Sequence, residues 1–243
     1  MQTVICMKWG TRYGADYVNR LHSSVQRHTK NPTRLVCFTD DASGIVPDVQ
    51  IQPLPDINLP PHPIVQAWRK LAVWQYPLAD LEGDILFLDL DLVITGYLDD
   101  FFTYEPGKYC VIENWTQLGE DKGNTSVFRF PAGKYTHIFD KVNADPQWVM
   151  DNYRIEQLYI SREIGEQIFW PRDWCVSFKH NLIPRWPLNL FQVPKLPNDT
   201  RIVAFTGKPD QDEALVGKWP EKNPLKRIYK HVRPTPWIGE HWQ

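Results

Sequence analysis

The sequence predicts an α/β fold: a single Rossmann-like domain with a mainly parallel central sheet and helices on both faces. The most informative segment is GDILFLDLD at residues 83–91, an apolar run of the kind found in strands that are buried on both faces. The elements up to Asp91 follow the order strand, helix, strand, strand, helix, strand, which favours parallel pairing. A length of 243 residues fits one large domain or two small ones, and no linker divides the chain.

Each element is predicted from its own local pattern. Apolar residues at helical spacing predict helices over 17–25 and 64–76, and the five prolines of residues 53–63 predict an extended loop between them. Later helices are expected around 135–142 and 155–159, and the tryptophan-rich tail 219–243 is expected to pack back over the domain. Strands are predicted at 3–7, 35–38, 49–51, 83–91, 109–113, 126–129 and 201–205, and the apolar pattern of 83–91 runs on into residues 92–95.

Composition narrows the class of protein. The net charge of −2 gives no global attraction to nucleic acid or to an anionic membrane, and no apolar run reaches the length of a transmembrane segment. The N-terminus lacks the pattern of a signal peptide. The four cysteines are far apart and form no CxxC pair, which is typical of buried free thiols in a reducing compartment. We therefore expect a cytoplasmic protein without nucleic-acid partners.

Two carboxylates end the buried strand, Asp89 and Asp91. Burying a carboxylate is costly unless a positive group meets it, and ligands of open α/β sheets bind beyond the carboxyl ends of the strands. Alternate residues of a strand share a face, so both carboxylates are expected to reach one divalent cation. Hard oxygen ligands suit Mg²⁺ or Mn²⁺.

Several segments, in their order along the chain, resemble the metal-dependent glycosyltransferases of the GT-A fold, and most of all the glycogenin and lipopolysaccharide galactosyltransferase types. They are VICMKWGTRY, LVCFTDD, AWRKLAVW, LFLDLDLVITG, GNTSVFRF, EQLYISRE and RIVAFTGKP. The resemblance implies one domain over 1–243, with a nucleotide-binding half at 1–95 and a half for sugar and acceptor at 96–243. It implies transfer of a sugar from a nucleotide-diphospho-sugar, with UDP favoured, to a glycan or other hydroxyl acceptor, and it favours retention of configuration.

The resemblance also implies roles for individual residues. Asp89 and Asp91 match the carboxylates that hold Mn²⁺ or Mg²⁺ against the donor diphosphate. The remaining matches are Gly207 and Lys208 at the diphosphate, Lys70 (or its neighbour Arg69) near the nucleotide, Gly10, Tyr13 and Asp40 at the nucleoside, and Asn124, Ser126, Glu156 and Gln157 around the transferred sugar.

The chain departs from the family pattern at two points. No histidine precedes Gly207, where relatives complete the metal shell, and His180 is the candidate substitute. Glu156 stands where relatives have aspartate. The aromatic side chains of Trp170, Trp174 and Trp186 are a hypothetical acceptor surface, because aromatic faces suit sugar rings.

Other functions fit parts of the pattern. LFLDLDLVIT also matches the haloacid-dehalogenase phosphatases, with Asp89 as nucleophile and Asp91 as acid/base. That interpretation leaves the two preceding strand–helix units unexplained. A non-catalytic module that binds nucleotide-sugars is a third alternative. A nucleotidyltransferase would need a glycine-rich phosphate loop after the first strand, where only Gly10 and Gly14 occur.

Overall fold

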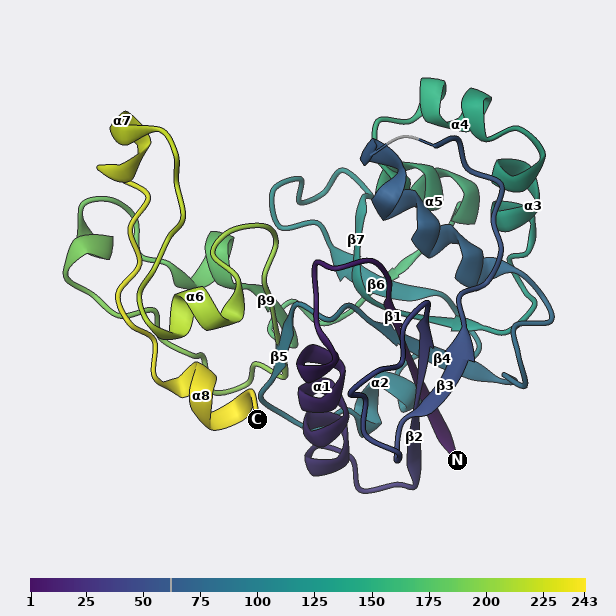
Figure 1. The fold of residues 1–243 in the computed structure, drawn as a ribbon, viewed down its shortest axis with the longest axis horizontal. Helices are drawn as coiled ribbons and strands as arrows, with labels where there is room; N and C mark the ends of the chain where they lie inside the picture. Colours follow the sequence, from purple (N-terminus) through teal and green to yellow (C-terminus); the bar gives the residue numbers. More distant parts are fainter. Residues whose placement is uncertain (62) are drawn as a thin grey trace.

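The computed structural model describes residues 1–61 and 63–243, with the backbone alone for 63–66. Its main sheet has seven strands in the order β3-β2-β1-β4-β7-β6-β8 (Figure 1). Strands β3, β2, β1 and β4 are parallel, β7 is antiparallel to both of its neighbours, and β8 is parallel to β6. The mainly parallel sheet is therefore confirmed. Its strands are β1 (Gln2–Lys8), β2 (Thr33–Thr39), β3 (Gln50–Pro53), β4 (Asp84–Leu88), β6 (Cys110–Glu113), β7 (Gly123–Pro131) and β8 (Ile168–Phe169).

The main sheet is buried on both faces, because alternate side chains of its central strands enter two separate cores. Leu86 and Leu88 of β4 pack with α1 (Ala15–Arg27) and α2 (Asp99–Thr103), whereas Ile85 and Phe87 pack on the opposite face. That second face is covered by the 3₁₀ helix η1 (Pro63–Trp74), α3 (His137–Ala144), α4 (Pro146–Asn152) and α5 (Glu156–Ile164) (Figure 1). Helices on both faces are thus confirmed.

The predicted helix over 64–76 is present as η1, a 3₁₀ helix, with Trp68, Leu71 and Ala72 buried. The side chain of Ile64, expected on the same face, lies outside the described residues. Helices α2 and α4 and the short strands β8 and β9 (Cys175–Ser177) had no clear sequence signal, because each is too short to show a period.

The strand predicted at 83–91 is shorter than expected, and residues 92–95, which run on from it in the sequence, contain a separate strand. Strand β4 ends at Leu88, and β5 (Leu92–Ile94) belongs to a second sheet with β10 (Ile202–Ala204) and β9 (Cys175–Ser177). The backbone N–H of Asp89 still bonds to Ser126 in the main sheet, whereas the carbonyl of Asp91 accepts from Phe205 beside the second sheet. The chain therefore crosses between the sheets at residues 89–91.

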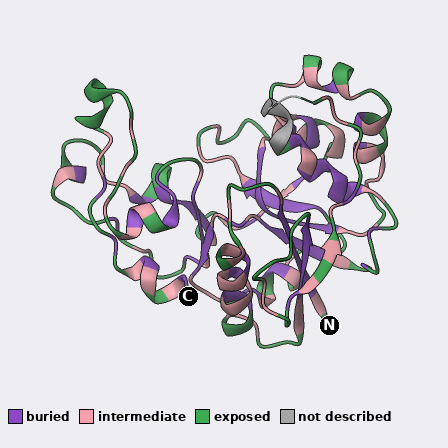
Figure 2. Cartoon of the chain, viewed as in Figure 1, coloured by how far each residue is buried: buried purple, intermediate pink, exposed green. Residues whose placement is uncertain are grey.

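Residues 175–243 form a C-terminal lobe around the second sheet, containing α6 (Gln211–Leu215), α7 (Pro224–Arg227) and α8 (Trp237–His241) (Figure 1). The end of the chain returns to α1: the Trp242 ring lies 5.1 Å from the Tyr17 ring, and Ser24 Oγ donates to the carbonyl of His241. The expectation that the tail packs back over the domain is confirmed for its end, whereas α7 in the same tail buries no residue. Figure 2 shows that the buried residues concentrate in the two sheets, while α7 is exposed.

All four cysteines are buried and free, as expected. Within residues 1–61 and 63–243 no helix has the length and apolar character needed to cross a membrane. The division at residue 95 into a nucleotide half and a sugar half stays a prediction.

Candidate functional site

The crossing segment Asp89-Leu90-Asp91 forms the centre of the candidate site. Leu90 is buried, and its carbonyl and that of Leu92 each lie 3.3 Å from the side-chain amide of Gln211 at the start of α6. This amide, 0 % exposed, fixes the crossing from the side of the C-terminal lobe. The two half-buried carboxylates on either side of Leu90 are thus held on a rigid backbone.

Lys70 of η1 provides the positive charge that the buried strand end requires. Its Nζ lies 2.7 Å from Oδ1 of Asp89 and donates to the carbonyl of Thr125 at 3.1 Å. Burial alone would lower the pKa of Lys70, but the charges of Asp89 and Glu156 outweigh this and raise it above its ordinary value. Lys70 is therefore charged and holds Asp89 in place. The alternative, Arg69, is the half-buried neighbour.

Asp91 is held from the loop that follows β1. The hydroxyl of Tyr13 donates to Oδ2 of Asp91 at 3.1 Å. Burial and the charge of Asp89 raise the pKa of Asp91 to about 7, although Lys70 and this hydrogen bond act in the opposite direction. Burial and the charge of Asp91 also raise the pKa of the Tyr13 hydroxyl, which keeps it a donor.

A rim of charged side chains connects Tyr13 to Lys208, the lysine predicted after the last strand. Lys208 Nζ lies 2.7 Å from both Asp210 and Glu213, and Asp210 lies 3.8 Å from Nη2 of Arg12, next to Tyr13. The structure thus places Lys208 and Gly207 on the same rim as Tyr13. Sequence reasoning missed Arg12 and Asp210; the run DQDE after the Gly-Lys-Pro turn was the available signal for the latter.

Gly10 and Asp40, predicted together at the nucleoside, do meet. The backbone N–H of Gly10 donates to Oδ2 of Asp40 at 3.0 Å. Gly10 has φ +61°, a conformation that residues with a Cβ adopt at a cost, although open space surrounds the position. Because both residues are exposed at the ends of neighbouring strands, a ligand can reach them.

The residues predicted around the transferred sugar lie next to the carboxylate pair. Oδ1 of buried Asn124 accepts from the N–H of Ser126, whose carbonyl in turn accepts from Asp89. Glu156 is buried at the start of α5; burial raises its pKa, and the charge of Lys70 limits the shift. Gln157 follows it in the same turn and is half-buried.

The donor set of the site fits a divalent cation that a ligand completes. Lys70 binds Oδ1 of Asp89 and Tyr13 binds Oδ2 of Asp91, which leaves the second oxygen of each carboxylate for a metal. In the described part of the chain no three His, Cys, Asp or Glu side chains gather as a metal site, so the structure does not bring His180 to the pair. Mg²⁺ is commonly held by one or two carboxylates together with substrate phosphates.

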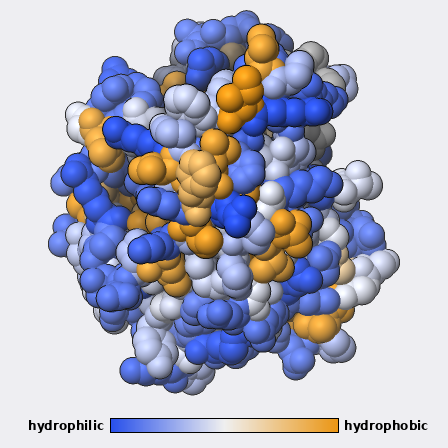
Figure 3. Space-filling model, turned by 90° about the vertical axis from the view of Figure 1, so that its left-hand side faces the viewer, coloured by the Kyte–Doolittle hydropathy of each residue, from blue (hydrophilic) through white to orange (hydrophobic). Residues whose placement is uncertain are grey.

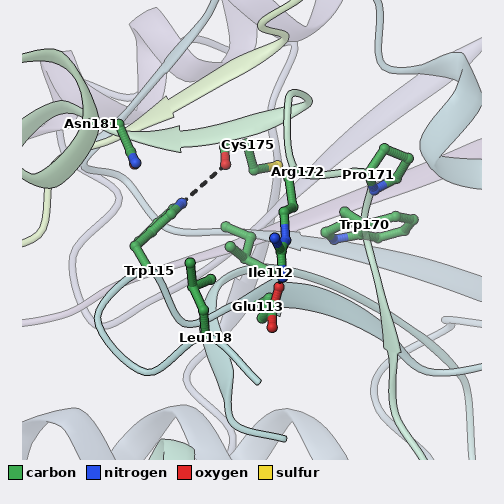
Figure 4. A pocket seen from close by; sticks show the side chains of 9 residues that line it. All are labelled: Ile112, Glu113, Trp115, Leu118, Trp170, Pro171, Arg172, Cys175 and Asn181. Carbon is green, nitrogen blue, oxygen red and sulfur yellow. Dashed lines mark hydrogen bonds and ion pairs between the residues drawn. The ribbon is translucent and has the colours of Figure 1, made fainter. Parts of the chain in front are cut away.

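A small cavity of about 90 Å³ opens at the edge where β6 ends (Figure 4). Apolar side chains of Trp115 and Leu118 face the ion pair of Glu113 and Arg172, whose Nε–Oε2 distance is 2.9 Å. In the sheet Glu113 is paired with Gly123, the residue before Asn124. The cavity therefore lies at the β6 side of the strand that carries Asn124 and Ser126.

The three tryptophans predicted as one acceptor surface do not form one. Trp170 is 2 % exposed, and its indole donates to the carbonyl of Val127 inside the main core. Trp174 is half-buried beneath Arg201, whose guanidinium lies 3.8 Å from its ring. Trp186 is exposed in the C-terminal lobe. The rings of Trp170 and Trp174 stack on each other with centroids 6.2 Å apart, whereas Trp186 lies apart from them, a division that composition alone does not show.

Comparison with known proteins identifies the fold. No protein-family model and no curated protein matches the chain. Among solved structures, the galactosyltransferase LgtC with donor and acceptor sugar analogues has a TM-score of 0.57 at 12 % identity, over 86 % of this chain and 89 % of LgtC. The glycosyltransferase GlyE of Streptococcus pneumoniae TIGR4 has a TM-score of 0.58 at 13 % identity, over 87 % of this chain. The bifunctional glycosyltransferase WbbM has a TM-score of 0.57 at 12 % identity, over 99 % of this chain.

The chain spans 56 % of GlyE and 51 % of WbbM, about half of each. At sequence identities of 12 % and 13 %, the similarity to these structures shows the fold alone. The chain has the GT-A-like fold of these glycosyltransferases, as its sequence motifs led us to expect.

Proposed function

We propose that this protein is a metal-dependent glycosyltransferase that moves a sugar from a nucleotide-diphospho-sugar, with UDP as its nucleotide, to a hydroxyl of a glycan or other small acceptor. The observation that carries the proposal is the carboxylate pair Asp89 and Asp91, fixed at the crossing between the two sheets of a fold shared with LgtC, GlyE and WbbM. No observation favours the phosphatase or the nucleotidyltransferase.

Asp89 and Asp91 would hold Mn²⁺ or Mg²⁺ through the oxygens that Lys70 and Tyr13 leave open. When bound, the cation neutralises the negative charge that develops on a diphosphate leaving group. Lys70 keeps one carboxylate oriented and charged, and Tyr13 orients the other.

Gly10, Tyr13 and Asp40 would bind the nucleoside from the loops after β1 and β2, and Gly207 and Lys208 would approach the diphosphate. Lys208 is now held by Asp210 and Glu213 on the surface, so a diphosphate would compete with these two carboxylates for its ammonium group.

Asn124, Ser126, Glu156 and Gln157 would surround the transferred sugar, whose hydroxyls suit amide, hydroxyl and carboxylate partners. A solved active-site mutant of LgtC carries glutamate in place of a glutamine, at 13 % identity over 86 % of this chain. That protein therefore has a glutamine in its active site, and Gln157 is the glutamine that the sequence resemblance assigns to the transferred sugar. Retention of configuration stays a prediction.

The cavity at Trp115, Leu118, Glu113 and Arg172 is the place where we propose that the acceptor binds (Figure 4). It combines apolar faces with a charged pair, which together suit a sugar ring and its hydroxyls. It replaces the acceptor surface of three tryptophans expected from the sequence.

Thermal-shift measurements with UDP-, GDP-, CDP- and dTDP-sugars, with and without Mn²⁺, test the proposal on the wild type and Asp91→Ala. A ligand that binds only the native state raises Tm by mass action. We expect a metal-dependent rise with one nucleotide, UDP, that Asp91→Ala abolishes. The control variant Asp173→Ala, which removes an exposed carboxylate elsewhere, should keep the rise. No rise with any nucleotide would refute donor binding, and a phosphatase activity lost in Asp89→Ala would replace the proposal.

A further inference from the structure

Large apolar side chains are exposed together at the far end of the C-terminal lobe. Phe191 is 77 % exposed, Leu225 73 % and Ile228 60 %. We define the lobe tip as residues 185–195 and 222–230. It also contains the exposed side chains of Trp186, Leu188, Val193 and Tyr229. Exposed apolar groups that gather in this way mark an interaction surface.

The two segments of the lobe tip are joined into one surface. The side-chain amide of Asn189, which is 2 % exposed, donates to the carbonyls of Tyr229 and His231 at 2.8 and 2.9 Å. In Figure 1 α7 stands at the outer end of the lobe, away from the main sheet. Figure 3 looks onto this side of the molecule and shows several groups of hydrophobic side chains with hydrophilic ones between them.

The charge around the lobe tip is strongly positive, although the chain as a whole carries 29 acidic and 27 basic residues. Residues 179–195 and 216–233 contain nine lysines and arginines but a single acidic residue, Glu221. That carboxylate is already paired with Lys230. Lys222, Lys226 and Arg227, by contrast, are exposed beside the apolar side chains.

We propose that the lobe tip docks onto the surface of an anionic lipid bilayer. Exposed leucine, isoleucine and aromatic side chains enter the boundary between headgroups and acyl chains, and lysine and arginine contact the lipid phosphates. Nucleic acid would match the positive charge but gives the aliphatic side chains of Leu188, Leu225 and Ile228 no apolar environment. The inference does not depend on the transfer reaction.

A second copy of the chain would also bring acidic surface to the lobe tip. Yet α7 stands at the outer end of the lobe (Figure 1), and a contact between folded proteins needs two surfaces of matching shape. A bilayer accepts a group of apolar and basic side chains without such complementarity.

Co-sedimentation with vesicles of phosphatidylcholine, alone or mixed with phosphatidylglycerol, tests the proposal. The wild type should bind the anionic vesicles, and binding should weaken as salt is added. Phe191→Ser with Leu225→Ser should weaken binding about tenfold or more, because two apolar anchors are lost. Lys226→Ala with Arg227→Ala should have an effect of about the same size.

Matched controls remove similar side chains elsewhere. Trp148→Ser with Tyr97→Ser removes two exposed aromatic rings, and Arg154→Ala with Arg162→Ala removes two exposed arginines. Both controls should bind vesicles as the wild type does. Circular dichroism and thermal unfolding of every variant establish that it is folded.

Three results would overturn the proposal. The first is absence of binding to anionic vesicles. The second is equal loss of binding in the control variants. The third is a wild type that does not bind vesicles and is a dimer by light scattering, while the Phe191 and Leu225 double variant is a monomer. That result would assign the lobe tip to a contact between copies of the chain.

Discussion

Removing the ammonium group of Lys70 should destabilise the fold strongly. In Lys70→Met the side chain keeps its volume, but Asp89 loses the partner at 2.7 Å while Glu156 and Asp91 stay near by. Breaking a buried ion pair in this way costs about 3–5 kcal/mol, and because the Asp89 side chain is 24 % exposed we expect the lower end. A loss of about 3 kcal/mol corresponds to a fall in Tm of roughly 6–12 °C for a domain of this size.

Thermal and urea unfolding followed by circular dichroism measure this loss, with Lys108→Met as the control. Lys108 also lies 2.7 Å from a carboxylate, that of Glu105, but the two side chains are 53 % and 43 % exposed. Such a surface pair is worth about 0–1 kcal/mol. If Lys70→Met lost no more stability than Lys108→Met, the view that Lys70 compensates the carboxylates of the site would be wrong. Mn²⁺ should raise the free energy of unfolding of Lys70→Met by more than it raises that of the wild type, because it supplies the positive charge that the variant lacks.

Three further predictions concern pH and packing. The pKa of Asp91 is raised from 3.8 to about 7, so between these pH values the folded state binds more protons than the unfolded state. The protonated carboxyl of Asp91 therefore stabilises the fold at low pH, and this stabilisation is lost as the pH rises towards about 7. The free energy of unfolding of the wild type should fall over that range relative to Asp91→Asn, as urea titrations at several pH values will measure. Trp242→Ala, which removes a ring packed on Tyr17 and Arg20, should cost about 3–5 kcal/mol in the same assay; a loss below about 1 kcal/mol would contradict the docking of the tail. Gly217→Ala should cost about 1–3 kcal/mol, since φ is +74° and a Cβ would lie 2.7 Å from the backbone nitrogen of Pro234, and unchanged urea unfolding would refute that contact.

The sequence predicted the α/β architecture well because its central strands are long, apolar and separated by periodic helices. Strands β1 and β2 have the expected burial, and α1 buries Val18, Leu21 and Val25 as its spacing requires. Short elements such as β8 and β9 were missed. They hold two and three residues and depend on tertiary partners, which a local pattern does not record.

The division of residues 83–95 into two strands shows a different limit. Every residue from Ile85 to Leu88 and from Leu92 to Ile94 is apolar and buried, so the local pattern is that of one strand. What separates them is the choice of partner: Leu88 pairs with Val127 of β7, whereas Leu92 pairs with Ala204 of β10. Pairing over such distances along the chain is not visible in a local pattern.

Within the site, the sequence placed the charged residues better than it assigned their contacts. Asp40 meets Gly10, as the predicted grouping at the nucleoside requires, whereas the bond of Tyr13 to Asp91 links two groups that the sequence kept apart. The bond of Lys70 to Asp89 was not predicted, because a lysine on a helix surface is usually solvated. Arg12 and Asp210 were missed for the related reason that an ion pair between distant loops has no local signature.

The crossing between the sheets explains why two carboxylates occur side by side in the interior of the protein. A residue in the middle of a sheet has both backbone groups engaged with neighbouring strands and points its side chain into a packed core. At residues 89–91 the backbone leaves one sheet before it enters the other, so Ser126, Phe205 and Gln211 satisfy its polar groups one by one. Only Leu90 enters the core, which leaves the flanking side chains at the junction of the sheets, where charge is compensated by Lys70 and remains accessible to a cation. The sequence Asp-Leu-Asp is thus a consequence of the fold as much as of the chemistry: an apolar residue anchors the crossing, and the two positions beside it are the ones free to carry charge.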